Sequence, residues 1–186
     1  VGATFTAERD SYLKLIEKSN MAYQFGGPRS FDFQEINDGE YNDWIGAQIR
    51  IDMYGWVLPG KPRLAADLAR RDAILSHRGC AVEASAYIAG LCALIPVSSS
   101  REEAVMSAME LIDKNSEAYE AVEIGINNKN KPASSLHDYY GDMSPVHSLN
   151  NLAVVVWAFL SFQDSFDEAI GETICCGWDT DCTGAT

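Results

Sequence analysis

Residues 80–95 read CAVEASAYIAGLCALI, and this stretch indicates the fold class more clearly than any other in the sequence. The stretch is rich in Ala, Leu, Ile and Val, and Glu83 is its single charged residue. A run of this length and composition predicts a helix that is buried on most of its sides. Glu83 therefore needs a partner inside the protein, or it lies on the one edge of the helix that water reaches.

Helical spacing of apolar residues recurs on both sides of this stretch. The predicted further helices cover residues 1–19, 62–75, a segment from residue 99 to about 112, a short segment around 119–126, and residues 148–162 and 166–175. Alternating patterns typical of β-strands are scarce. The sequence therefore predicts an all-α fold in a single domain over residues 1–186.

Several of these helices have recognisable start signals. The expected caps and first-turn residues are Thr4 and Thr6 before the first helix, Pro62 in the second, the capping box Ser99-Ser100-Arg101-Glu102, and Ser148 before the apolar helix. In the helix after Pro62, the residues Leu64, Leu68 and Leu75 form one stripe, which predicts an amphipathic helix. Two long segments, residues 25–44 and 127–145, are expected to be loops because of their turn-forming residues.

The overall charge excludes some classes of partner. The chain has 14 Lys and Arg against 27 Asp and Glu, a net charge of -13. Nucleic acids and anionic membranes are attracted by basic surfaces, so neither is an expected partner. No apolar run is long enough to cross a bilayer. The five cysteines are odd in number and show no paired CxxC spacing, which favours a reducing, cytoplasmic location.

The C-terminal stretch GWDTDCTGAT, residues 177–186, concentrates acidic and hydroxyl side chains. Asp179 is interpreted either as the N-cap of a short helix or, together with Asp181 and a nearby threonine hydroxyl, as part of a site for Mg²⁺, Mn²⁺ or Ca²⁺. Residues 179–184 also approach the first half of an EF-hand loop, so a calcium-binding protein is a third interpretation.

Motifs elsewhere in the chain form a pattern together with this stretch. They are Gly46-Ala47-Gln48-Ile49-Arg50, the turn Pro59-Gly60, the helix Ala65-Ala66-Asp67-Leu68-Ala69, the pair Ser76-His77 and the motif Gly177-Trp178-Asp179-Thr180-Asp181-Cys182. In this order and spacing the chain resembles the ADP-ribosylglycohydrolase family, over roughly residues 44 to 186. Residues 1–40 match no motif of that family.

The resemblance implies that the all-α fold is a multi-helix orthogonal bundle. It also implies a hydrolase that cleaves the N- or O-glycosidic bond of an ADP-ribosyl or related ribosyl group through two Mg²⁺ ions, with Mn²⁺ possible in their place. The expected partner is an ADP-ribosylated or ribosylated protein or small molecule. A non-catalytic nucleotide-sugar-binding or structural member of the same fold is the alternative. The implied residues are Asp179 and His77 for catalysis, Asp179, Asp181 and Thr183 for metal binding, and Gly46, Gln48, His77, His147 and Asn150 for substrate binding.

Two features depart from the pattern that the resemblance implies. The position after the second aspartate often carries a Thr or Ser ligand, whereas here it is Cys182, and a thiol is a poor ligand for Mg²⁺. The early Asp-Asp segment that supplies the other half of the metal site is not found in the sequence. The chain is therefore expected to be a fragment, incomplete at both ends, that binds Mg²⁺ poorly and has little or no activity.

Overall fold

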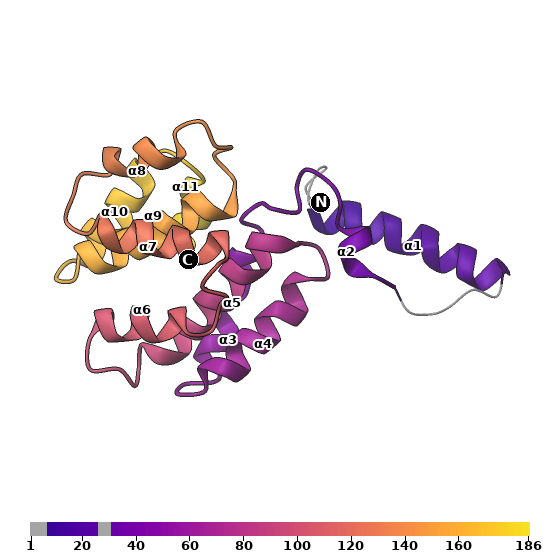
Figure 1. The fold of residues 1–186 in the computed structure, drawn as a ribbon, viewed down its shortest axis with the longest axis horizontal. Coiled ribbons are helices and arrows are strands. Elements are labelled where there is room, and N and C mark those ends of the chain that lie inside the picture. The colour runs from indigo at the N-terminus through magenta and orange to yellow at the C-terminus, as the bar shows by residue number, and fades with distance from the viewer. Residues whose placement is uncertain (1–6, 26–30) are drawn as a thin grey trace.

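The computed structural model describes residues 7–25 and 31–186, and its regular structure is helical (Figure 1). The helices are α1 (Ala7–Phe25), α2 (Phe33–Ile36), the 3-10 helix η1 (Gln48–Arg50), α3 (Asp52–Trp56), α4 (Pro62–Ala73), α5 (Gly79–Leu94), α6 (Arg101–Met109), α7 (Glu117–Asn127), α8 (Ser134–Tyr140), α9 (Ser148–Ser161), α10 (Phe166–Cys175) and α11 (Thr180–Ala185). The predicted all-α fold is confirmed.

Helix α5 lies at the centre of the core, as its composition predicts. It packs against α3, α4, α6, α7 and α9, and most of its residues are buried. Its one charge, Glu83, is half-buried and accepts hydrogen bonds from Arg70 Nε at 3.0 Å and Arg70 Nη2 at 2.9 Å. Glu83 therefore has a partner and also lies at an edge that water reaches.

The face that α4 buries differs from the predicted leucine stripe. Its buried residues are Ala65, Ala66, Ala69 and Ala73, whereas Leu64 and Leu75 are 47% and 53% exposed. Helices α4 and α5 pack extensively against each other. Small side chains allow two helices to approach closely, so alanines make this contact, while Leu64 on α4 and Leu75 after it stay largely exposed.

The two predicted loops both contain helix. Helix α1 continues to Phe25 and α2 follows it, while α8 lies within the segment 127–145. Leu136 of α8 is fully buried beside Trp157 of α9, so tertiary packing favours a helix that the local sequence does not indicate. Thr4 and Thr6, the expected caps of the first helix, lie outside the described residues.

Two predicted caps are one residue out of register. Ser100 caps α6 by accepting from Glu103 N at 3.1 Å, and Glu103 in turn accepts from Ser99, so the capping box is shifted by one position. Helix α9 is capped by the His147 ring, whose Nδ1 accepts from Leu149 N at 3.2 Å. The predicted cap, Ser148, instead donates its hydroxyl to the backbone carbonyl of Asp43 at 2.8 Å.

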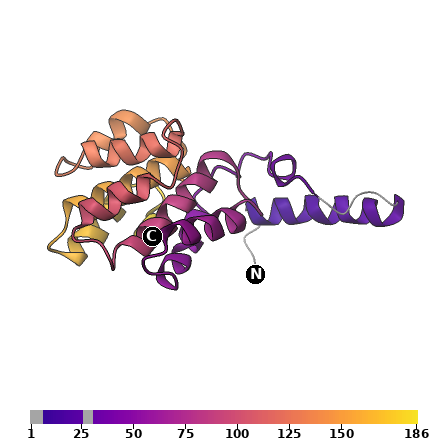
Figure 2. The ribbon, with the colours of Figure 1, turned by 60° about the horizontal axis from the view of Figure 1, so that its bottom comes forward.

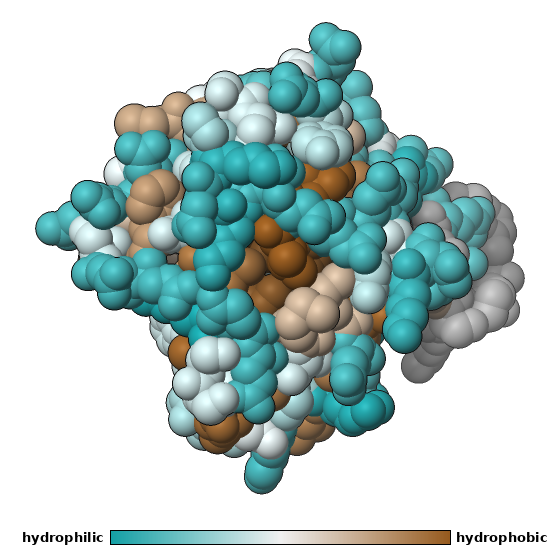
Figure 3. All heavy atoms as spheres, turned by 60° about the vertical axis from the view of Figure 1, so that its left-hand side comes forward, coloured by the Kyte–Doolittle hydropathy of each residue, from teal (hydrophilic) through white to brown (hydrophobic). Residues whose placement is uncertain are grey.

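Helix α1 extends away from the rest of the molecule (Figures 1 and 2). Tyr12 and Leu13 on this helix are 60% and 49% exposed. On the face shown in Figure 3, apolar atoms are also exposed at the bottom of a hollow between polar side chains. Among the described residues, no helix combines the length and the apolar character needed to cross a membrane.

Candidate functional site

Two segments that are distant in the sequence meet next to η1. Ile45 N donates to Val146 O at 2.9 Å and Ser148 N donates to Asp43 O at 3.0 Å, which forms an isolated antiparallel bridge. These bonds hold the residues before η1 against the start of α9. The Gly46 segment and the His147 segment are thereby brought to one place.

The third segment of the site is the turn between α10 and α11. Asp179 is the N-cap of α11, and its Oδ1 accepts from Cys182 N at 3.3 Å. The helix-cap interpretation is therefore confirmed. The EF-hand interpretation is wrong, because residues 180–185 form a helix and an EF-hand needs an open loop there.

Asn151, fully buried on α9, holds this turn in place. Its Oδ1 accepts from Asp179 N at 3.2 Å and from the Thr183 hydroxyl. Its Nδ2 donates to Pro145 O at 2.8 Å and to His147 O at 2.7 Å. One amide side chain therefore links the start of α11 to the loop before α9. Asn151 is not among the predicted site residues, because an asparagine within an apolar helix is its only signal in the sequence.

The turn is fixed from its other side by α8. The ring of His137 stacks on Trp178 with 4.2 Å between the centroids, and His137 Nε2 is 2.9 Å from Cys176 O. His137 is exposed, and nothing in its sequence neighbourhood indicated this contact. Asp179 is therefore held by neighbours on both sides.

A cavity of about 210 Å³ lies where the three segments meet the start of α1. Its walls include Gly46 and His77 from the first half of the chain and Asp179 and Cys182 from its C-terminal stretch. Glu8 of α1 also lines it. A Cβ atom at Gly46 would lie 3.3 Å from Glu8 Oε1 and 3.3 Å from His77 Nε2. The absence of a side chain at Gly46 therefore leaves space beside both of these polar groups.

His77 is almost fully buried, in the turn between α4 and α5. Burial lowers its pKa to about 4, the Glu8 carboxylate raises it in part, and the Arg50 cation lowers it further. The ring is therefore neutral at pH 7.

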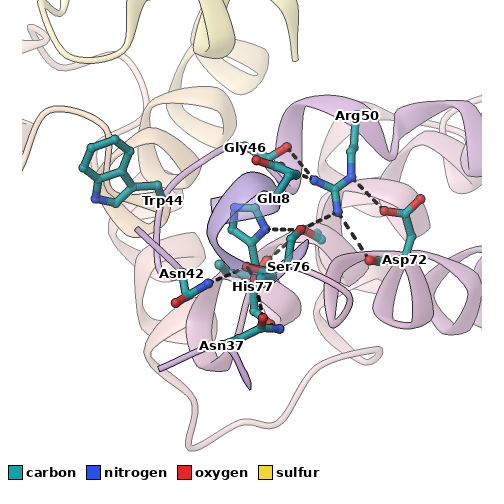
Figure 4. A network of polar contacts seen from close by, with 12 residues as sticks. Glu8, Asn37, Asn42, Trp44, Gly46, Arg50, Asp72, Ser76 and His77 are labelled. Atoms are coloured by element: carbon teal, nitrogen blue, oxygen red, sulfur yellow. Dashed lines mark hydrogen bonds and ion pairs between the residues drawn. The ribbon is translucent and has the colours of Figure 1, made fainter. Parts of the chain in front are cut away.

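The turn that carries His77 is held by two asparagines of the segment before η1 (Figure 4). Asn37 Nδ2 donates to Ile74 O at 2.7 Å and to His77 O at 3.1 Å. Asn42 Nδ2 donates to Ser76 O at 2.6 Å. Residues in the segment expected to be a long loop thus position His77.

Arg50 connects this turn to α1 and α4 (Figure 4). Its Nε donates to Asp72 Oδ1 at 2.7 Å, its Nη2 donates to Ser76 Oγ at 2.9 Å, and its Nη1 forms an ion pair with Glu8. The second oxygen of Asp72 accepts from Tyr54 at 3.0 Å. Because Arg50 has a partner on each edge of its guanidinium group, its orientation is fixed.

Asp179, Asp181 and Cys182 form the one cluster of possible metal ligands found among the described residues, with ligand atoms within 4.8 Å of one another. Burial and the neighbouring Asp181 raise the pKa of Asp179, while the hydrogen bond with Asp179 lowers that of Asp181. Burial and Asp179 raise the pKa of the Cys182 thiol to about 12, so it stays protonated. The oxygen donors fit Mg²⁺, which is often held by one or two carboxylates and water; a protonated thiol does not fit a metal that binds thiolate.

Residues 6–186 match the family described as ADP-ribosylglycohydrolase. The chain belongs to the ADP-ribosylglycohydrolase family. Searches of curated proteins and of solved structures found no significant match. The family match also includes residues 6–43, so the limit of the resemblance at about residue 44 was wrong, and Glu8, Asn37 and Asn42 lie in a part of the chain that the family shares.

The structure brings only some of the site residues that the ADP-ribosylglycohydrolase resemblance implies into one cavity. Gly46, His77 and Asp179 line one cavity. Asp181 is adjacent to Asp179 and exposed. Thr183 lies on another side of α11, where it donates to Asn151 and borders a second, apolar cavity of about 250 Å³.

The three remaining residues do not line the cavity. Gln48 is fully buried, and neither polar atom of its side chain has a protein partner. His147 caps α9, and Asn150 donates to Ser144 O at 3.0 Å and accepts from Asn151 N at 2.9 Å. In this arrangement His147 and Asn150 shape the loop that borders the cavity.

Proposed function

We propose that the chain forms the ribosyl-binding part of a hydrolase that cleaves the N- or O-glycosidic bond of an ADP-ribosyl or related ribosyl group. The observation that carries this proposal is the single cavity in which Gly46, His77 and Asp179 meet. The family match supports the type of reaction. The partner would be an ADP-ribosylated or ribosylated protein or small molecule, and the five free cysteines are compatible with the proposed cytoplasmic location.

The charges around the cavity favour the sugar over the diphosphate as the group that enters it. Glu8 and Asp179 both line the cavity, and carboxylates accept hydrogen bonds from hydroxyl groups but repel phosphate. The small volume, about 210 Å³, suits one ribose ring better than a whole nucleotide. We therefore place the ribosyl hydroxyls between Asp179 and Glu8, and the diphosphate outside the cavity.

Asp179 and Asp181 would hold Mg²⁺, or Mn²⁺ in its place. A bound divalent cation would lower the pKa of a coordinated water and so supply a nucleophile. The chain's own contribution is to hold Asp179 in a fixed orientation, through Asn151 on one side and the Trp178 stack on the other. Because two carboxylates and a protonated thiol make a weak site, we expect low Mg²⁺ affinity and little turnover from this 186-residue polypeptide.

Thermal unfolding with and without added ligand tests the proposal, since a ligand that binds the folded state raises its melting temperature. We expect Mg²⁺ and ADP-ribose to raise the melting temperature of the wild type and of the control Asp164→Asn, which changes an exposed aspartate between α9 and α10. Asp179→Asn is expected to abolish the response to Mg²⁺. An unchanged response of Asp179→Asn, or a larger response to Ca²⁺ than to Mg²⁺, would count against the site.

Replacement of the thiol gives a second test of the metal site. Cys182→Ser supplies an oxygen in place of sulfur, so we expect it to bind Mg²⁺ several-fold more tightly than the wild type, measured by calorimetric titration. Cys182→Ala is the matched control, because it removes the thiol without adding an oxygen. Equal affinities of the two variants would show that residue 182 does not contact the ion.

Cys182 also favours a second candidate function, a nucleotide-sugar-binding protein without catalysis. A thiol in place of an oxygen ligand weakens the metal site but leaves the cavity and His77 intact. Release of ADP-ribose from an ADP-ribosylated peptide separates the two functions. Metal-dependent release by this chain would support the hydrolase and contradict the expected low turnover. Stabilisation by ADP-ribose without any release from the peptide, in the wild type and in Cys182→Ser, would support the binding protein.

A further inference from the structure

Ser76 lies between a guanidinium group and an imidazole ring. Arg50 Nη2 is 2.9 Å from Ser76 Oγ, and Ser76 Oγ is 2.8 Å from His77 Nδ1 (Figure 4). An arginine side chain has N–H donors and no acceptor, so the Ser76 oxygen must accept the hydrogen bond from Arg50. The hydroxyl proton of Ser76 then remains to be placed.

His77 Nδ1 is the acceptor that the described contacts offer to this proton. If Nδ1 carried a proton instead, the Ser76 oxygen would accept two hydrogen bonds and its own proton would have no partner. Ser76 is 3% exposed, and buried hydroxyl groups are rarely left without a partner. The neutral imidazole carries a proton on one nitrogen, so Nε2 holds it.

We propose that Ser76, oriented by Arg50, fixes His77 as the Nε2–H tautomer, so that His77 presents a hydrogen-bond donor to the cavity and does not act as a base there. Nε2 lies on the cavity side, 3.3 Å from the position of a Cβ at Gly46. The ligand group that it recognises is an oxygen acceptor, such as a sugar hydroxyl. The identity of that ligand rests on the proposed function, whereas the tautomer does not depend on it.

The charged groups around His77 keep this arrangement in place. Glu8 from α1, Arg50 from η1 and Asp72 from α4 interact with the ring, and Asp179 and Cys182 of the last turn line the same cavity. Asp72 and Glu8 also anchor Arg50, which holds its Nη2 against Ser76. Burial keeps the pKa of His77 at about 4, so the ring is neutral and a single tautomer can be defined at pH 7. Ser76 and Arg50 are thus positioning residues for His77.

The tautomer can be measured directly by long-range ¹H–¹⁵N correlation spectra of the histidine rings in the ¹⁵N-labelled wild type at pH 7. The chain has 3 histidines, so His137→Gln and His147→Gln variants assign the His77 signals. We expect His77 Nε2 to have the chemical shift of a protonated nitrogen and Nδ1 that of an unprotonated one. A protonated Nδ1 in the wild type would overturn the proposal without any variant.

Removal of the hydroxyl tests the role of Ser76. In Ser76→Ala we expect both ring nitrogens to shift towards averaged values, because nothing then selects one tautomer. Ser85→Ala is the matched control, because Ser85 is also buried and its hydroxyl donates to Ala81 O at 2.7 Å within α5. Ser76→Thr restores a hydroxyl and is expected to restore the tautomer. An unchanged His77 spectrum in folded Ser76→Ala would contradict the proposal.

Calorimetric titration with ADP-ribose separates this proposal from the proposed function. If both hold, Ser76→Ala binds ADP-ribose about tenfold more weakly than the wild type and Ser85→Ala binds it equally well. If the wild type shows the Nε2–H tautomer and no affinity for ADP-ribose, the tautomer stands and the proposed ligand is wrong. If Ser76→Ala changes the tautomer but not the affinity, His77 does not contact the ligand and the donor role is wrong.

Discussion

At the scale of single residues, His77 makes stability depend on pH. Its pKa is about 4 in the folded protein and near 6.5 in an unfolded chain, so the unfolded chain binds the proton more readily. The contribution to stability is complete above about pH 6.5 and is lost as the pH falls towards 4. We expect this residue alone to lower the free energy of unfolding by roughly 3 kcal/mol over that range, measured by urea denaturation.

The variant His77→Gln isolates this effect from the titration of carboxylates. It has no ring to protonate, so its stability should fall less between pH 7 and pH 4 than that of the wild type. Equal slopes for His77→Gln and the wild type would mean that folding does not lower the pKa of His77.

At the scale of helices, close packing around α5 depends on glycine. A Cβ at Gly55 of α3 would lie 2.3 Å from Cys92 Cβ and 2.6 Å from Ala89 O. Gly55→Ala must therefore separate α3 from α5, and we expect it to destabilise the protein by roughly 1–3 kcal/mol. Chemical denaturation measures the change.

Gly171 of α10 provides the opposite case. A Cβ there would meet nothing within 4 Å, and the position is exposed. Alanine has the better helix propensity, so Gly171→Ala should stabilise the protein by roughly 0.5–1 kcal/mol. If Gly55→Ala and Gly171→Ala changed stability in the same direction, close packing would not explain why residue 55 is a glycine.

At the scale of the whole molecule, α1 and the central core differ in their surroundings. Helix α1 extends from the body, and its main helical neighbour is the short α2, whereas α5 is surrounded by other helices (Figures 1 and 2). Segments with little buried contact open locally at low free energy. We expect amide hydrogens of residues 12–20 to exchange several orders of magnitude faster than those of residues 84–91, measured by mass spectrometry. Equal protection would show that α1 is covered in solution.

Much of the fold follows from local pattern. The apolar composition of α5 and of α9 indicates buried helices, because these runs are too long for an ordinary buried strand, and both helices occur where the sequence places them. The local pattern did not predict the features that contacts between helices determine. Helix α8 forms because Leu136 is buried against α9, and α4 buries alanines because α5 lies close to it. Neither neighbour is visible from the local sequence.

The features of the candidate site also divide into those that the sequence indicates and those that tertiary packing determines. The sequence by itself determined the family motifs, the acidic pair Asp179 and Asp181, and the thiol that follows them. The tertiary structure alone decided that Glu8 and His77 share a cavity with Asp179, and that Asn151 holds the turn. The physical reason is that burial, and with it the pKa of His77 and the choice of its tautomer, is set by segments far away in the chain that the fold brings together.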